Sequence, residues 1–276
     1  MMKVGFIGTG SMGSILVDAF LTAKTLTPDQ IIVSNRTREK ALLLSDRFPG
    51  LTVAETNIQT VQMSEIIFLC VKPLEFKRVI DDVSPHLGSN KIVISITSPI
   101  LIEDLEKQMP CKIAKVIPSI TNSVAAGASL LMFGNRCGKA DRIKVRNLFE
   151  QISRPLEIEE SKVRVSSDIV SCGPAFISYL LQRFIHAAVE ETGISNEEAT
   201  FLTTEMVIGL AALLSRGPFD LPTLQQRVCV PGGVTGAGIL ALEQIGDVFN
   251  HMYKNTQKRY DEDLKDVSDM FYGTNH

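Results

Sequence analysis

The first half of the chain alternates short apolar runs with longer amphipathic segments. Six apolar runs, at residues 3–7, 31–34, 52–54, 66–71, 91–96 and 112–117, predict buried β-strands. A segment long enough for a helix follows each of them. Strands that alternate with helices predict a parallel sheet covered on both faces. Residues 128–133 and 156–158 are expected to add edge strands around a helix near residues 140–151.

After residue 159 the strand pattern stops and helical periodicity takes over. Pro174 in a first turn predicts a helix to Thr192, with Phe176, Leu180 and Phe184 on one face. A capping box at residues 195–198 predicts the start of a second helix.

The second helix is expected to run towards residue 215. Its stretch 206–214 is apolar almost all round and must be covered, inside a domain or at a subunit interface. A further helix is expected from about Ala237, leading to a charged tail over residues 254–265. The chain is therefore expected to be α/β, with a doubly wound Rossmann sheet over residues 1–159 and an all-α domain over residues 160–276.

A glycine-rich hexapeptide follows the first strand and opens the first helix. It reads Gly8-Thr9-Gly10-Ser11-Met12-Gly13 and fits the pattern G-x-G-x-x-G. In this context the glycines allow a tight turn, close approach of backbone to a pyrophosphate, and packing of helix on strand. The pyrophosphate would then meet the N-terminus of the helix. The sequence predicts a dinucleotide site here.

The end of the second strand distinguishes between the two nicotinamide dinucleotides. An NAD site normally has a carboxylate there to accept from the ribose 2′-hydroxyl, but this chain reads Ser34-Asn35-Arg36-Thr37. The guanidinium of Arg36 suits a 2′-phosphate, and Ser34 and Thr37 could donate to it. Alternatively, Arg36 is a solvated turn residue and Thr37 a helix N-cap. The missing carboxylate favours NADPH.

Polar residues also follow the later strands. Val71-Lys72-Pro73 ends the fourth strand, at the sheet edge where ligands lie in doubly wound folds. Lys72 either borders the cofactor or is a loop lysine that takes no part in binding. Residues 95–98 and 118–122 end the next two strands and are expected on the nicotinamide side.

A second glycine-rich loop lies in the helical half. It reads Val230-Pro231-Gly232-Gly233-Val234-Thr235 and continues with Gly236 and Gly238. Exposed backbone N–H groups before a helix could hold an anion such as a substrate carboxylate. The alternative is a glycine-rich turn between two helices.

The charge balance and the cysteine pattern limit the kinds of partner and compartment that the sequence predicts. With 28 basic and 31 acidic residues and no basic runs, neither nucleic acid nor an anionic membrane is expected. No leader segment is visible, and the longest apolar run is far shorter than the roughly 20 residues of a membrane span. Five scattered cysteines and four histidines without ligand spacing predict no metal and a reducing, cytoplasmic setting.

Taken together, these motifs resemble the pyrroline-5-carboxylate reductase family over nearly the whole chain. The segments that carry the resemblance are the phosphate loop, Asn35-Arg36, Val71-Lys72-Pro73, Gly173-Pro174-Ala175-Phe176 and above all Pro231-Gly232-Gly233-Val234-Thr235. The resemblance implies a helical substrate domain that interleaves with a partner's to form a homodimer, with higher assembly open.

The resemblance also implies an activity and roles for residues. The activity is NADPH-dependent reduction of a cyclic imine, 1-pyrroline-5-carboxylate to L-proline or a related imino acid. Thr235 would hydrogen-bond the imine nitrogen, and the N–H groups of Gly233, Val234 and Thr235 would hold the carboxylate.

The chain departs from the family pattern on the substrate side. Val230 stands where the family usually has a serine, Ser95-Ile96-Thr97-Ser98-Pro99 where an Ala-Ala-Gly turn is usual, and Pro118-Ser119-Ile120-Thr121 where Pro-Asn-Thr-Pro is usual. The phosphate loop is spared. This pattern is similar to that of the reductase-like branch found in late-competence operons. It suggests that the protein keeps the family's cofactor but acts on a different substrate.

Two other functions stay open. A β-hydroxyacid dehydrogenase of similar architecture needs a lysine on the first helix of the second domain, and residues 173–183 contain none. A non-catalytic NADP-binding sensor or assembly protein is compatible with Val230 and the altered turns.

Overall fold

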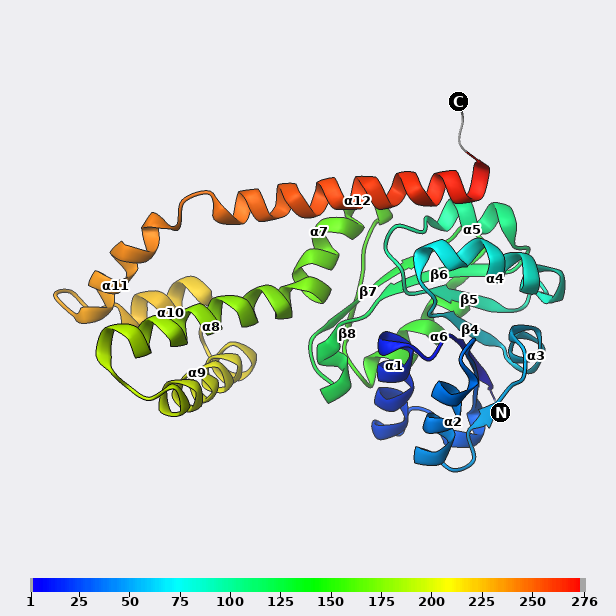
Figure 1. Ribbon diagram of the computed structural model, residues 1–276, viewed down its shortest axis with the longest axis horizontal. Helices are drawn as coiled ribbons and strands as arrows, with labels where there is room; N and C mark the ends of the chain where they lie inside the picture. The colour runs from blue at the N-terminus through cyan, green and yellow to red at the C-terminus, as the bar shows by residue number, and fades with distance from the viewer. Residues whose placement is uncertain (1, 274–276) are drawn as a thin grey trace. The chain divides into compact units, whose positions relative to one another are not determined.

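The computed structural model describes residues 2–273 (Figure 1). One compact unit holds the chain through Pro174 together with the segment from Asn255 onward, and the other holds Ala175–Lys254. The first unit is a Rossmann-type α/β domain and the second is helical, which confirms the predicted fold class. The division into functional domains at residue 159 stays a prediction.

An eight-stranded sheet forms the centre of the first unit, with strand order β3-β2-β1-β4-β5-β6-β7-β8. The strands are β1 Val4–Ile7, β2 Ile31–Ser34, β3 Thr52–Val53, β4 Ile66–Leu69, β5 Ile92–Ser95, β6 Lys112–Ile117, β7 Ala128–Phe133 and β8 Arg154–Glu157. Strands β1 to β6 are parallel, and β7 runs antiparallel to β6. Strand order reverses at β1, which pairs with both β2 and β4, so a ligand crevice is expected at the carboxyl end of β1.

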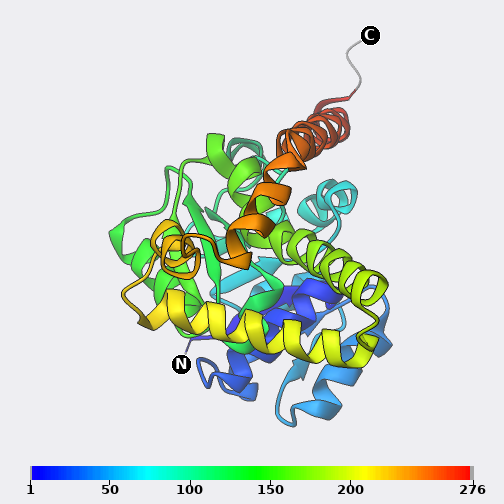
Figure 2. The ribbon, with the colours of Figure 1, turned by 90° about the vertical axis from the view of Figure 1, so that its left-hand side faces the viewer.

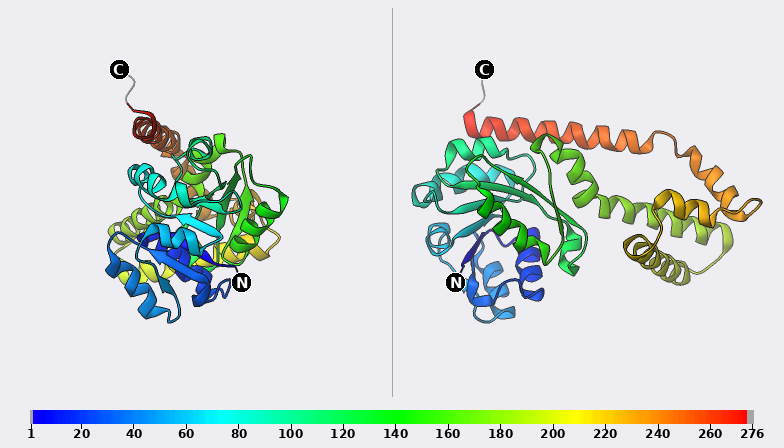
Figure 3. Two further views of the ribbon diagram at one scale, coloured as in Figure 1. Left: turned by 90° about the vertical axis from the view of Figure 1, so that its right-hand side faces the viewer. Right: turned by 180° about the vertical axis from the view of Figure 1, so that it is seen from behind.

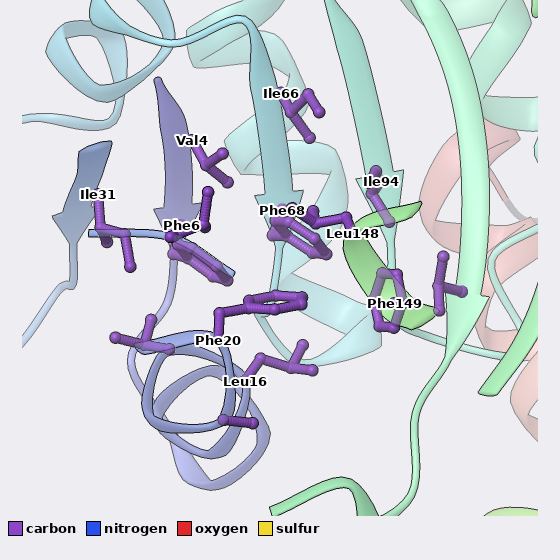
Figure 4. Close-up of a cluster of buried hydrophobic side chains, with 14 of the residues drawn as sticks. Val4, Phe6, Leu16, Phe20, Ile31, Ile66, Phe68, Ile94, Leu148 and Phe149 are labelled. Carbon is purple, nitrogen blue, oxygen red and sulfur yellow. The ribbon is translucent and has the colours of Figure 1, made fainter. Parts of the chain in front are cut away.

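Helices cover both faces of this sheet (Figure 3). They are α1 Ser11–Thr22, α2 Arg38–Arg47, α3 Asn57–Met63, α4 Phe76–Val83, α5 Ile102–Gln108, α6 Lys139–Glu150, the short α7 Val163–Ser167 and the C-terminal part of α12 Val248–Tyr272. Successive strand residues point to opposite faces, and each face therefore buries a separate apolar cluster. On the face covered by α1, α2 and α6, Phe6 and Phe68 stack with ring centroids 4.7 Å apart, and Phe20 and Phe149 pack beside them (Figure 4).

The C-terminal helix α12 differs from the predicted charged tail. Tyr260, Val267 and Phe271 are buried against the face that α4 and α5 cover. Their spacing of seven and four residues places them on one side of a helix, and the charged residues between them face away. The prediction of a charged tail was wrong because the density of charges hid this apolar stripe.

The second unit consists largely of helices (Figure 2). They are α8 Gly173–Thr192, α9 Asn196–Arg216, α10 Leu221–Val228 and α11 Val234–Leu242. The predicted capping box is present, because the Ser195 hydroxyl accepts from the N–H of Glu198 at 3.1 Å. Helix α11 begins three residues earlier than predicted, so Gly236 and Gly238 lie inside it.

This unit buries almost no core within one chain. Among residues 175–254, all of which are described, only Ala199 and Thr203 are buried. Large side chains such as Phe184, Phe201 and Ile208 are exposed. By length and composition α9 could also cross a membrane, but a helix covered by a second protein chain has the same composition.

Candidate functional site

The phosphate loop has the backbone geometry that its glycines predict. Gly8 has a φ of +100°, and a side chain there would place its Cβ 2.8 Å from the carbonyl oxygen of Cys70. A Cβ on Gly13 would lie 2.2 Å from the carbonyl oxygen of Gly8, so only glycine lets α1 approach the strand. At Gly10 a Cβ would have no described neighbour within 4 Å, which leaves this backbone open to a ligand.

Asn35 holds the loop in this shape. The backbone N–H of Thr9 donates to Oδ1 of Asn35 at 2.9 Å, and Ser14 Oγ donates to the Thr9 carbonyl at 2.9 Å. The buried hydroxyl of Thr9 has no hydrogen-bond partner among the described residues. An orphaned hydroxyl beside the free N–H groups that begin α1 fits a phosphate group.

A cleft of about 530 Å³ opens beside this loop at the end of β2. Arg36 and Thr37 line it just before α2, Lys40 lines it from the first turn of α2, and Arg78 lines it from α4. These cations suit a 2′-phosphate, and Lys40 and Arg78 were not anticipated from the sequence. Lys40 stands three residues after Thr37, which is helical spacing within one turn, and that spacing was the available signal.

Ser34 lines the same cleft, but its hydroxyl already donates to another side chain of the lining. It is buried and donates to Oδ1 of Asn57 at 2.9 Å. Nδ2 of Asn35 donates to the carbonyl of Thr37 at 2.8 Å. In this structure Ser34 and Asn35 therefore shape the turn that presents Arg36 and Thr37.

A second cleft, of about 480 Å³, lies on the other side of the phosphate loop. It is lined by Gly10, Ser11, Met12, Cys70, Val71, Lys72, Ile96, Thr97, Ser98, Pro99, Ile117, Pro118, Ser167 and Ser171. Lys72 is exposed at its rim, whereas Pro73 begins the short 3-10 turn Pro73–Glu75 outside the lining. A dinucleotide that extends past its pyrophosphate loop would place its nicotinamide here, so we expect this cleft to be the nicotinamide end of the site and call it the nicotinamide-end cleft.

The expected contribution of residues 118–122 is only partly present. Pro118 lines the cleft, but Ser119 and Asn122 are buried in a 3-10 turn. Oδ1 of Asn122 accepts from the N–H of Ser119 at 2.8 Å and from Ser129 Oγ at 3.0 Å. Ser167 and Ser171, from α7 and the π-helical turn Asp168–Cys172 that follows it, were missed because no sequence pattern marked that turn.

A buried charged cluster lies behind the nicotinamide-end cleft. The ammonium of Lys115, on β6, pairs with Glu160 and donates to the Ser98 carbonyl at 3.1 Å. The hydroxyl of Tyr260 donates to the same carbonyl at 3.3 Å. Burial lowers the pKa of Lys115 and, together with the charge of Glu160, raises the pKa of Tyr260 to about 12.

The second glycine-rich loop belongs to the helical unit. Val230, Pro231, Gly232 and Gly233 form a type II turn, in which the N–H of Gly233 donates to the Val230 carbonyl at 3.0 Å and Gly232 has a φ of +74°. A Cβ on Gly233 would lie 2.9 Å from Cγ2 of Val230, so the valine packs against this glycine.

This turn leads directly into α11. Gly233 caps the helix, and the N–H groups of Val234 and Thr235 are the first that lack an intrahelical partner. A largely apolar cleft of about 580 Å³ lies beside the turn, lined in part by Cys229, Val230 and Leu240. Val234 and Thr235 lie outside that lining, and Val234 is 91% exposed.

Sequence comparison matches both halves of the chain. Residues 3–99 match the family described as NADP oxidoreductase, coenzyme F420-dependent, and residues 160–263 match pyrroline-5-carboxylate reductase dimerisation. ComE operon protein 4 of Bacillus subtilis (strain 168) is 47% identical over 272 residues, covering 98% of this chain and 100% of that protein. Pyrroline-5-carboxylate reductase 3 of the same organism is 26% identical over 95% of this chain and 96% of its own length.

Solved structures show the same fold. The pyrroline-5-carboxylate reductase of Coxiella burnetii has a TM-score of 0.82 at 24% identity, over 98% of both chains. That of Plasmodium falciparum, described with NADP bound, has a TM-score of 0.81 at 24% identity, over 99% of this chain and 98% of its own.

The phosphate loop, its cleft and the N-terminal family match define an NADP-dependent oxidoreductase of the Rossmann type. The chain belongs to the pyrroline-5-carboxylate reductase family. Its similarity to ComE operon protein 4 confirms the resemblance to a reductase-like paralogue, and its cofactor is NADPH.

Proposed function

We propose that this protein reduces a cyclic imine with NADPH, and that the substrate is 1-pyrroline-5-carboxylate or a related imino acid. The observation that carries the proposal is the type II turn at Val230–Gly233 and its entry into α11, in a chain whose other unit binds NADP. A helix N-terminus with free N–H groups suits a carboxylate, and a neighbouring threonine suits an imine nitrogen.

The roles of the loop residues follow from its hydrogen bonds. The N–H of Gly233 is used within the turn, so the free donors begin at Val234 and Thr235. We assign these two N–H groups to the substrate carboxylate, with Gly232 and Gly233 keeping the backbone open. The Thr235 hydroxyl hydrogen-bonds the imine nitrogen. NADPH supplies the hydride, and a protonated imine needs orientation rather than a strong acid.

The proposal includes a homodimer in the cytoplasm. Helices α8, α9 and α11 expose apolar side chains in one chain, and residues 160–263 match a dimerisation family. A second copy would cover those faces. We propose no nucleic acid or membrane partner, and the five cysteines are free thiols, which suits a reducing compartment.

A non-catalytic NADP-binding sensor is the second candidate, and one observation favours it. Val230 is exposed and presents two methyl groups beside the turn, where a hydroxyl would help to hold a carboxylate. The dehydrogenase alternative has less support, since α8 carries no lysine over Gly173–Thr192.

NADPH oxidation against a panel of five- and six-membered cyclic imino acids tests the proposal. We expect turnover with at least one five-membered imino acid, and loss of that turnover in Thr235→Val with NADPH binding intact. Tight NADPH binding without turnover on any member of the panel would favour the sensor.

A further inference from the structure

We propose that Lys115 is a positioning residue for the nicotinamide end of the cofactor site, and that it acts by fixing the turn Thr97-Ser98-Pro99. The inference rests on the expectation that the second cleft holds the nicotinamide end of NADPH, and it does not depend on which imine the protein reduces. Its test uses binding without turnover, so a failed imine assay and a failed positioning role are distinguishable.

The turn between β5 and α5 has one side on the cleft and the other on the charged cluster. Thr97, Ser98 and Pro99 line the cleft together with Gly10 and Met12. Among the described contacts, only a weak 3.3 Å bond from the Thr97 N–H to Ser95 Oγ holds the turn locally. Its shape therefore depends on what holds its carbonyl and N–H groups from behind.

Lys115 and Glu160 hold the segment at both ends. The Lys115 ammonium donates to the Ser98 carbonyl at 3.1 Å, and a Glu160 carboxylate oxygen accepts from the N–H of Ile102 at 3.0 Å. The two side chains also pair with each other. The Lys115 cation binds the Ser98 carbonyl, and the Glu160 carboxylate binds the N–H of Ile102, four residues later. Each charge therefore matches the polarity of the backbone group that it binds.

Tyr260 adds a third attachment from a distant part of the sequence. Its hydroxyl donates to the same Ser98 carbonyl at 3.3 Å, and the Arg164 guanidinium lies over its ring at 5.5 Å from the centroid. One carbonyl thus receives donors from β6 and from α12. Its orientation is fixed from two directions, and so are the side chains of the turn on the opposite side.

Stability alone is a poor reason for a lysine at this position. The Lys115 side chain is fully buried, and the adjoining residues of its strand, Ala114 and Val116, are apolar. Replacing a buried ion pair by apolar residues is often neutral or stabilising, because desolvation offsets the attraction between the charges. A buried lysine that reaches the wall of a ligand cleft therefore points to positioning.

The test compares two ligands that share the adenosine end. NADPH fills both clefts, whereas adenosine 2′,5′-bisphosphate lacks the nicotinamide and fills only the first. In Lys115→Met, which loses a charge-assisted hydrogen bond to the Ser98 carbonyl, we expect NADPH to bind about tenfold more weakly. In Tyr260→Phe, which loses a neutral hydrogen bond to the same carbonyl, we expect NADPH to bind about fivefold more weakly. The bisphosphate should bind within about twofold of the native protein. The chain has no tryptophan, so the fluorescence of bound NADPH reports the nicotinamide environment directly.

Matched variants separate positioning from folding. Lys112→Met removes another lysine from β6, one that pairs with Asp141 at 2.7 Å, and should leave the NADPH affinity unchanged. In Lys115→Met with Glu160→Gln neither charge is left unpaired, so the melting temperature should recover from that of Lys115→Met while NADPH binding stays weak. If NADPH affinity recovers with the melting temperature, or if both ligands weaken in parallel, the positioning role is overturned.

Discussion

Arg36 and Glu75 form an ion pair with 2.5 Å between Nη1 and Oε1 at the adenosine end of the cofactor cleft. The Arg36 side chain is 71% exposed and that of Glu75 is 29% exposed. Both side chains line the cleft, so the carboxylate of Glu75 is paired with the guanidinium that we assign to the 2′-phosphate. A cofactor phosphate and Glu75 are therefore competing anions for one cation.

Removing the guanidinium of Arg36 should weaken the binding of NADPH but not that of NADH. One charge-assisted hydrogen bond is worth about 1.5–3 kcal/mol, so Arg36→Ala should weaken NADPH binding about tenfold or more. NADH lacks the phosphate, and its affinity should be nearly unchanged. Calorimetric titration of both cofactors measures this. Equal affinity of the native protein for NADPH and NADH would contradict the role of Arg36.

Removing the competing anion should have the opposite effect. An exposed ion pair is worth about 0.2–1 kcal/mol, so Glu75→Gln should tighten NADPH binding up to about fivefold and leave NADH unchanged. Glu55→Gln is the matched control, because Glu55 lines the same cleft and its nearest cation is Arg38, at 3.8 Å. An equal gain in both variants would mean that general charge, rather than the Arg36 pair, is responsible.

Much of the first unit could be predicted from the sequence because local patterns determine it. The runs at 31–34, 112–117 and 128–133 are strands with those bounds, and the phosphate loop lies between strand and helix as its spacing predicts. The run at 66–71 was predicted too long, because Cys70 and Val71 continue the apolar pattern after the strand has ended. The apolar composition continues past the end of the strand, because Cys70 and Val71 are half-buried residues that line the second cleft.

The parts of the site that were missed depend on contacts between residues far apart in the sequence. Asn57 receives the Ser34 hydroxyl across 23 residues, and Tyr260 reaches the Ser98 carbonyl across 162. Lys115 sits in a correctly predicted strand, but nothing in its neighbours distinguishes a buried lysine from a surface one. Only the tertiary structure brings its partner Glu160 within reach.

Tyr260 should make the folded protein sensitive to alkaline pH. Its pKa is about 12 when folded against 10.0 when unfolded, so the folded state retains this proton longer. Its contribution to stability is complete below pH 10 and is lost as the pH rises through 12. Between those values the unfolding free energy of the native protein should fall by up to about 2–3 kcal/mol more than that of Tyr260→Phe. Denaturant titration at several pH values measures the difference, and Tyr179→Phe serves as a control at an exposed tyrosine. If the unfolding free energies of the native protein and Tyr260→Phe fall in parallel with pH, the prediction is wrong.

The exposed apolar faces of the helical unit lead us to expect a dimer at micromolar concentration. Phe201, on α9, is 64% exposed in one chain, and its burial by a second copy would contribute several kcal/mol across the interface together with its neighbours. Phe201→Asp should therefore dissociate or unfold the dimer, whereas Val124→Asp, on the Rossmann unit and 75% exposed, should not. Light scattering measures the oligomeric state of each variant, and a monodisperse monomer of the native protein would refute the expectation.

Val230 should weaken, without abolishing, reduction of 1-pyrroline-5-carboxylate. A serine at this place would present a hydroxyl donor beside the turn, and losing one hydrogen bond to a charged acceptor costs about 1.5–3 kcal/mol. The KM for that substrate should then lie about one to two orders of magnitude above that of a family member with the serine. The N–H groups at the start of α11 survive, and so does Thr235.

Two substitutions in the loop test this reading with steady-state kinetics. Val230→Ser should lower KM and change kcat little, because it adds binding that the ground state and the transition state share. Thr235→Val should remove nearly all turnover and leave NADPH affinity unchanged. If Val230→Ser leaves a weak activity as it was, the altered turns at Thr97–Pro99 and Ser119–Thr121 must control the substrate instead. A native enzyme with a KM already as low as that of its serine-bearing relatives would mean that the valine is neutral.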